Sequence, residues 1–187
     1  MPFGKQRVLP AVKQMKELEK LLSSPFEYIV LLGGKIGMLR PIIELAEHQG
    51  KKILLHADLI DGLKNDEYAA EFLCQQIRPA GLISTRMSVI QRTKQNGLLS
   101  IQRIFLIDSG AMEKSVELAI KAKPDFIEVL PGVIPHLIAE VKERTSIPVI
   151  AGGMIRTVSE QEEALCAGAV AVTTSRRELW SMDMSHI

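Results

Sequence analysis

The chain has 187 residues and a formal net charge of +1, and 47% of its residues are hydrophobic and 24% charged, which is typical of a soluble globular protein. The balanced charge excludes a whole-protein attraction to nucleic acid or to a membrane surface. Aromatic residues make up only 4%, so the core must be built from aliphatic side chains. No segment approaches the roughly 20 apolar residues of a membrane span, and no signal-peptide pattern is present. We therefore expect a cytoplasmic protein that has no membrane partner.

Short apolar runs recur along the whole chain, and an amphipathic helical pattern follows each one. The runs are nearly continuous and rich in β-branched residues, which is typical of strands that are covered on both faces. The predicted strands are Val8–Val12, Tyr28–Leu32, Lys52–Ala57, Gly81–Thr85, Leu98–Arg103, Phe126–Leu130, Pro148–Ala151 and Ala169–Thr173.

The predicted helices carry recognisable start signals. Pro135 fits the first turn of a helix. Ser159 with Glu162, and Ser175 with Glu178, have the spacing of a capping box. These signals predict helices that begin near residues 135, 159 and 175.

Two cysteines, Cys74 and Cys166, fall inside predicted helices on their apolar sides. Neither lies in a CxxC or another metal-binding spacing. Free cysteines behave as small apolar side chains and are among the most buried residues. Both are therefore predicted to be buried free thiols.

Eight strand units alternate strictly with eight helical units. Strict alternation predicts a parallel sheet with helices on its faces, and eight units allow the sheet to close. We predict a compact α/β protein, a single (β/α)₈ TIM-barrel domain over residues 1–187. An open doubly wound sheet is the alternative, but the only candidate dinucleotide loop, Gly33-Gly34 with Gly37, lacks the GxGxxG spacing.

The segment PVIAGGMI, followed by AGAVAVTTS, predicts a phosphate site. In such barrels ligands bind at the carboxyl ends of the strands, and phosphates often bind after strands 7 and 8. Glycines allow backbone N–H groups to approach an anion, and the start of a final helix would attract negative charge. Alternatively, the glycines only form a tight turn. The predicted phosphate site comprises Gly152, Gly153, Thr173, Thr174 and Ser175.

Polar residues also end the middle strands: His56, Asp58, Arg86, Arg103 and Glu128. His56 and Asp58 are two residues apart, so they would share one face of a strand. Glu128 lies among apolar neighbours and needs a partner, which Arg103 or Arg86 could supply. These residues could form a structural network, recognise the hydroxyls of a small polyol, or act as an acid/base pair or metal site. Nothing in their spacing demands a metal ion, and we predict no metal and no cofactor.

The strand ends lack the residues of a typical barrel enzyme. Barrels that decarboxylate or isomerise sugar phosphates commonly use a lysine at the end of a strand, whereas Lys35 and Lys64 lie in predicted loops. No Ser-His-Asp or Cys-His arrangement can be placed on adjacent strands. The site is therefore predicted to bind a ligand without catalysis. A sugar-phosphate lyase, isomerase or decarboxylase remains the alternative.

Several arginines are expected on the rim that surrounds this site. One phosphate ligand would occupy only two or three of them, and the surplus is compatible with contact to a nucleic-acid backbone. No RRM-type aromatic motif and no helix-turn-helix is found. The candidates for RNA contact are Arg86, Arg103, Arg156, Arg176 and Arg177. Lys51, Lys52 and Lys123, at the opposite end of the barrel, are the alternative surface.

Seven segments carry a family resemblance: VLPAV, HADLIDGLKNDEY, GLISTR, QRIFLIDSGAMEKS, KPDFIEVLPGVIP, PVIAGGMI and AGAVAVTTS. In this order they resemble the glycerol uptake operon antiterminator regulatory protein family, over almost the whole chain. PVIAGGMI is common to phosphate-binding barrels, whereas HADLIDGL, QRIFLIDSGAMEKS and PDFIEVLPG are more specific. The resemblance implies a sensor of glycerol 3-phosphate, not an enzyme, that acts on leader mRNA of glycerol-utilisation genes and prevents early termination. It leaves open whether the chain forms a homodimer.

Overall fold

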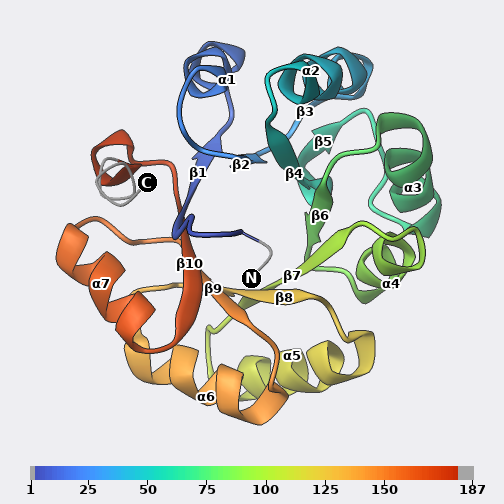
Figure 1. The fold of residues 1–187 in the computed structure, drawn as a ribbon. Helices are drawn as coiled ribbons and strands as arrows, with labels where there is room; N and C mark the ends of the chain where they lie inside the picture. The colour runs from blue at the N-terminus through green and yellow to red at the C-terminus, as the bar shows by residue number, and fades with distance from the viewer. Residues whose placement is uncertain (1–2, 181–187) are drawn as a thin grey trace.

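The computed structural model describes residues 3–180 and forms a closed barrel of parallel strands in the order β1-β2-β4-β6-β7-β8-β9-β10, with β10 returning to β1 (Figure 1). The predicted (β/α)₈ barrel is confirmed. Its strands are β1 (Val8–Val12), β2 (Tyr28–Leu31), β4 (Lys52–His56), β6 (Gly81–Ser84), β7 (Leu99–Phe105), β8 (Phe126–Leu130), β9 (Val149–Gly152) and β10 (Ala169–Thr174). Two further short strands, β3 (Gly34–Lys35) and β5 (Ile60–Asp61), pair with each other outside the barrel.

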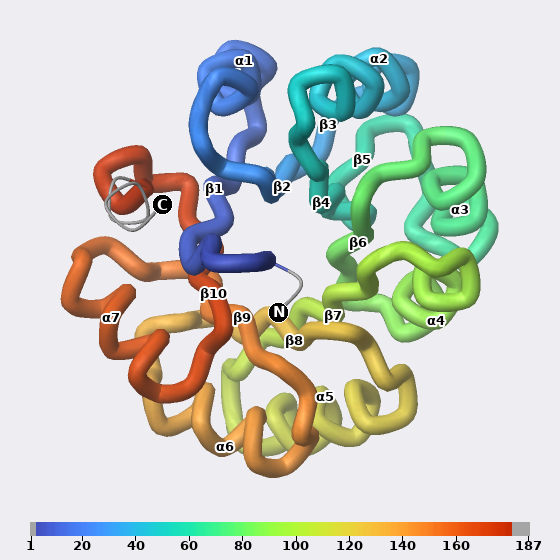
Figure 2. The backbone as a smooth tube through the Cα atoms, viewed as in Figure 1, coloured from blue at the N-terminus to red at the C-terminus, as the bar shows by residue number. Residues whose placement is uncertain are grey.

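Helices surround the strands as an outer ring (Figure 2). They are α1 (Met15–Leu22), α2 (Ile36–His48), α3 (Glu67–Phe72), α4 (Met87–Gln95), α5 (Ser109–Ala122), α6 (Pro135–Thr145) and α7 (Val158–Cys166), and a π-helical turn (Leu73–Ile77) extends α3. In the described residues, the unit predicted to begin at Ser175 is a 3₁₀ turn over 177–180. None of the helices within residues 3–180 is both long and apolar enough to cross a membrane.

The start of α7 differs from the prediction. Thr157, and not Ser159, is the N-cap residue, because its side chain accepts a hydrogen bond from the N–H of Glu160. The Glu160 carboxylate accepts in return from the N–H of Thr157 at 3.0 Å. The capping box therefore lies two residues earlier than predicted.

The barrel interior is filled by one apolar cluster to which each of the eight barrel strands contributes. Its members from the strands are Leu9, Ala11, Tyr28, Val30, Leu54, Ile83, Ile101, Phe126, Ile150 and Ala171. The N-terminal segment runs toward the centre of the ring (Figure 2). There the Phe3 ring lies 4.8 Å from the ring of Phe126 and 5.1 Å from that of Tyr28, between ring centroids. Phe3 thus closes the amino-terminal end of the interior.

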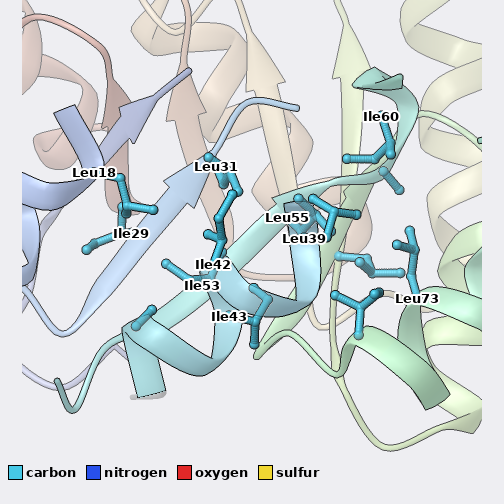
Figure 3. Close-up of a cluster of buried hydrophobic side chains, with 14 of the residues drawn as sticks. Leu18, Ile29, Leu31, Leu39, Ile42, Ile43, Ile53, Leu55, Ile60 and Leu73 are labelled. Atoms are coloured by element: carbon cyan, nitrogen blue, oxygen red, sulfur yellow. The ribbon is translucent and has the colours of Figure 1, made fainter. Parts of the chain in front are cut away.

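A second apolar layer lies between the strands and the helices. Figure 3 shows Leu39, Ile42 and Ile43 of α2 packed toward Ile53 and Leu55 of β4. Burying each such side chain contributes about 1.5–3 kcal/mol. Aliphatic side chains therefore cover both faces of the sheet, as expected for parallel strands.

The two cysteines have different environments. Cys74 is buried in this outer layer, and burial raises the pKa of its thiol to about 11. Cys166 is exposed, so its predicted burial is wrong. It lies two residues after the buried Ala164, which places it about 200° around the helix, on the solvent side.

Candidate functional site

A polar layer covers the apolar interior at the carboxyl end of the barrel. Along each strand, the residue two positions after an inward-facing residue also faces inward. This pattern places five of the predicted site residues directly above the apolar cluster. They are His56, Arg103, Glu128, Gly152 and Thr173.

Glu128 is the centre of this layer. Its side chain is only 1% exposed, and Arg103 donates from Nε to its Oε2 atom at 2.7 Å. The hydroxyl of Thr173 donates to the other carboxylate oxygen at 2.6 Å. Arg103, and not Arg86, is therefore the partner of Glu128. Both carboxylate oxygens already accept a hydrogen bond, so Glu128 is held in place and in turn orients Arg103.

A cavity of about 320 Å³ opens above this layer, and we call it the carboxyl-end cavity. Its volume lies at the small end of the usual range for ligand pockets, about 300–1,000 Å³. It brings together eight of the predicted residues: Arg103, Glu128, Gly153, Arg156, Thr173, Thr174, Ser175 and Arg176.

The apolar wall of the cavity was not predicted as part of the site. It consists of Ala11, Val30, Leu32, Leu130, Met154 and Ile155. Leu32 and Leu130 each follow an inward-facing residue, Val30 and Glu128, by two positions. Strand periodicity alone could therefore have identified these two.

Two adjacent glycines have different roles. A Cβ atom on Gly152 would lie 2.5 Å from Oγ1 of Thr173 and 2.8 Å from Oε1 of Glu128, so Gly152 leaves room for their hydrogen bond. Gly153 has a φ of +74° and lines the cavity. Within the described residues, the N–H groups of Gly153 and Ser175 donate to no protein acceptor. Two backbone donors of residues that line the cavity are thus available to a ligand.

His56 belongs to the polar layer but does not line the cavity. It is buried, and within the described residues neither ring nitrogen has a hydrogen-bond partner. Burial, followed by the positive charge of Arg103, lowers its pKa to about 4, against the opposing charges of Asp58 and Glu128. The ring is therefore neutral at pH 7.

Asp58 does not share a strand face with His56, because β4 ends at His56 and Asp58 lies in a 3₁₀ turn. The carboxylate of Asp58 instead accepts from the Ser84 hydroxyl, and from the N–H and hydroxyl of Thr85 at 2.8 Å and 2.7 Å. Burial raises the pKa of Asp58, but these hydrogen bonds outweigh it and hold the pKa below its usual value. Asp58 thus joins the ends of β4 and β6. Within residues 3–180, no group of three His, Cys, Asp or Glu side chains could hold a metal ion.

The five rim arginines divide into two groups. Arg103, Arg156 and Arg176 line the cavity. Arg86 is exposed at the start of α4, and Arg177 pairs with Glu17 at 2.8 Å. These last two do not line the cavity, so they are not placed to contact a ligand there.

Comparison with known proteins identifies the family. The family described as "Glycerol-3-phosphate responsive antiterminator" matches residues 8–180. A glycerol uptake operon antiterminator regulatory protein from Listeria monocytogenes is 46% identical, with a TM-score of 0.94 over 97% of this chain and 98% of that one. A glycerol uptake operon antiterminator-related protein from Thermotoga maritima is 27% identical, with a TM-score of 0.83 over 95% and 99%. The uncharacterised protein YgcP of Escherichia coli is 31% identical over 94% of this chain and 92% of its own length. The chain belongs to the glycerol-3-phosphate responsive antiterminator family.

Proposed function

We propose that the chain is an antiterminator that binds glycerol 3-phosphate in the carboxyl-end cavity and, in that state, binds leader mRNA of glycerol-utilisation genes. The main support is the position and lining of the cavity. It lies after β9 and β10 and includes Gly153 and Ser175, whose N–H groups donate to no acceptor in the described protein. This is the usual position for phosphate in a barrel of this kind.

The phosphate end of the ligand would lie against these two N–H groups. Arg156 and Arg176 line the same side of the cavity. The charged lining residues are three arginines and Glu128, which gives a net charge of +2. A phosphate monoester carries about −1.5 to −2 at pH 7. The positive charge of the cavity lining therefore balances the negative charge of a phosphate monoester.

The glycerol end would lie over the polar layer. Arg103 uses Nε to bind Glu128, which leaves its terminal guanidinium N–H groups as donors. The carboxylate of Glu128 has further lone pairs that can accept from ligand hydroxyls. A donor and an acceptor side by side suit the two hydroxyl groups of glycerol 3-phosphate.

The same lining argues for a sensor rather than an enzyme. No lysine is among the described residues that line the cavity, and Glu128 is held by Arg103 and Thr173. The only buried histidine of the layer, His56, does not line the cavity. No observation in the cavity favours a lyase, isomerase or decarboxylase.

The decisive experiment measures coupling between effector and RNA. Fluorescence anisotropy would give the affinity of the chain for a labelled leader transcript of a glycerol uptake operon, with and without glycerol 3-phosphate. We expect the effector to strengthen RNA binding, because a ligand shifts an equilibrium only when it binds the two states differently. Calorimetry should then show RNA strengthening effector binding by the same factor, commonly about 5- to 150-fold. An RNA affinity unchanged by saturating glycerol 3-phosphate would contradict the proposal.

A further inference from the structure

A second concave site lies at the opposite end of the barrel. It has a volume of about 590 Å³ and lies where β4, β6 and β7 begin, and we call it the amino-end groove. Three cations, Lys51, Lys52 and Arg78, border it. The remaining lining is largely apolar: Tyr28, Ile43, Ile53, Pro79, Ala80 and Leu99, with Gly50 and Glu47.

The loops at this end of the barrel are the more basic ones. The segments that lead into the eight barrel strands, counted together with the first residue of each strand, hold six basic residues, Lys5, Arg7, Lys51, Lys52, Arg78 and Lys123, and two acidic residues, Glu27 and Asp125. Their net charge is +4, in a chain whose net charge is +1. Up to residue 180, the segments that follow the barrel strands, counted together with the last residue of each strand, hold seven basic and five acidic residues, a net charge of +2.

Both acidic residues at the amino-terminal end already have partners. Glu27 pairs with Lys52 at 2.8 Å. Asp125 accepts from the N–H of Ser100 at 2.9 Å and from its hydroxyl at 2.7 Å. The acidic groups therefore hold the loops together, and they leave exposed cations such as Arg78 and Lys123 available to an external anion.

Arg78 and Lys123 occupy unusual backbone positions. Each follows a helical segment and has a left-handed conformation, with φ values of 56° and 49°, where glycine is the usual residue. Both side chains are exposed, and within the described residues neither has a hydrogen bond or ion pair. Nζ of Lys94 donates to the carbonyl of Lys123 and lies 3.8 Å from Asp125, which brings a second cation to the loop before β8.

We propose that the amino-end groove and its basic border bind RNA. The inference rests on the proposed function, since it names the surface that an antiterminator would use. Lys and Arg side chains neutralise backbone phosphates, and proteins that bind single strands combine such a basic border with a surface on which unpaired bases lie. The apolar groove takes a base, while Lys51, Lys52, Arg78 and Lys123 contact phosphates. Effector and RNA then bind opposite ends of the barrel and do not compete for the same arginines.

The test compares three double variants, each of which removes two positive charges. Arg78→Gln/Lys123→Gln, the groove variant, removes Arg78 from the groove and Lys123 from the loop before β8 at the same end of the barrel. Arg86→Gln/Arg177→Gln alters the effector rim outside the cavity, and Lys114→Gln/Lys121→Gln alters exposed positions on α5. The RNA affinity of each is measured against salt, with the labelled leader transcript and saturating glycerol 3-phosphate. Calorimetry with glycerol 3-phosphate and thermal melting monitored by circular dichroism report whether each variant is folded.

We expect the groove variant alone to lose RNA affinity, by on the order of ten-fold at 0.1 M salt, with a salt dependence reduced by about two phosphate contacts. Its affinity for glycerol 3-phosphate in the absence of RNA should equal that of the wild type. If only the rim variant loses RNA affinity, or if the groove variant behaves like the α5 variant, the inference is overturned and the proposed function stands. If the wild type binds no RNA with saturating effector, the proposed function itself fails.

Discussion

Arg103 donates from Nε to Oε2 of Glu128 at 2.7 Å, and this ion pair joins β7 to β8 directly below the carboxyl-end cavity. The pair lies between the apolar interior and the cavity, and Arg103 is 12% exposed. The arginine is thus oriented before any ligand binds. A binding group that is already in place reduces the entropic cost of association.

The buried pair should be much more important for stability than a surface pair of the same type. Glu128→Gln removes the charge that balances a largely buried guanidinium and should lower the free energy of unfolding by about 3 kcal/mol. Glu113→Gln is the matched control, because Glu113 binds Arg144 at 2.6 Å but is 61% exposed, and it should change stability little. Urea unfolding of the two variants measures the difference. Equal losses would show that burial does not strengthen the Arg103 pair.

Gly152 should be required for the packing of the polar layer. In Gly152→Ala the new methyl group would lie within 3 Å of both Thr173 and Glu128, so we expect a loss of about 1–3 kcal/mol. Gly37→Ala is the control, because Gly37 lies in the first turn of α2 with nothing within 4 Å of its Cβ position, and it should not destabilise the protein. Thermal or urea unfolding tests both. A Gly152→Ala protein as stable as the wild type would contradict the geometry of the layer.

His56 should make the protein less stable in mild acid. Its pKa is lowered from 6.5 to about 4 in the folded chain, so between these values the unfolded chain binds the extra proton. The free energy of unfolding should therefore fall as the pH decreases from about 6.5 to 4, by up to about 1.4 kcal/mol per pH unit from this group. His56→Asn should reduce this slope, whereas His48→Asn, at an exposed position of α2, should leave it unchanged. Parallel wild-type and His56→Asn profiles would show that His56 does not titrate in this way.

Most of the barrel could be predicted from the sequence, because buried parallel strands form continuous apolar runs. β1 and β8 begin and end at the predicted residues. The pair of strands β3 and β5 was missed, since two residues are too few to show a pattern and the pairing joins distant segments. β7 extends two residues beyond Arg103, because Ile104 and Phe105 pair with β8.

The site was predicted less completely than the fold. The cavity residues after β9 and β10 follow from the glycine pair and from the rule that places phosphates there. The position of Asp58 could not be predicted, because it depends on a turn at the end of β4 and on hydrogen bonds from Ser84 and Thr85, far along the chain. The alternation of inward-facing and outward-facing side chains ends where the strand ends, and β4 ends at His56, before Asp58.

The cavity should bind without turnover. Its described lining contains no lysine, and its one carboxylate is held by two hydrogen bonds. After incubation with the protein, glycerol 3-phosphate and common sugar phosphates should be recovered unchanged, as phosphorus NMR would show. A product formed at about 1 per second, the low end of ordinary enzyme rates, and lost in Glu128→Gln, would favour an enzyme.

Binding of glycerol 3-phosphate to Gly153→Asp tests the proposed effector site most directly. The substitution places a carboxylate beside the predicted phosphate position, so calorimetry should detect no binding. Gly97→Asp is the matched control, because Gly97 has the same φ of +74° with open space around it, and it lies just before β7, at the other end of the barrel. It should suffer similar backbone strain and keep the wild-type affinity. If Gly153→Asp binds glycerol 3-phosphate as tightly as Gly97→Asp and the wild type do, the effector does not bind in the carboxyl-end cavity.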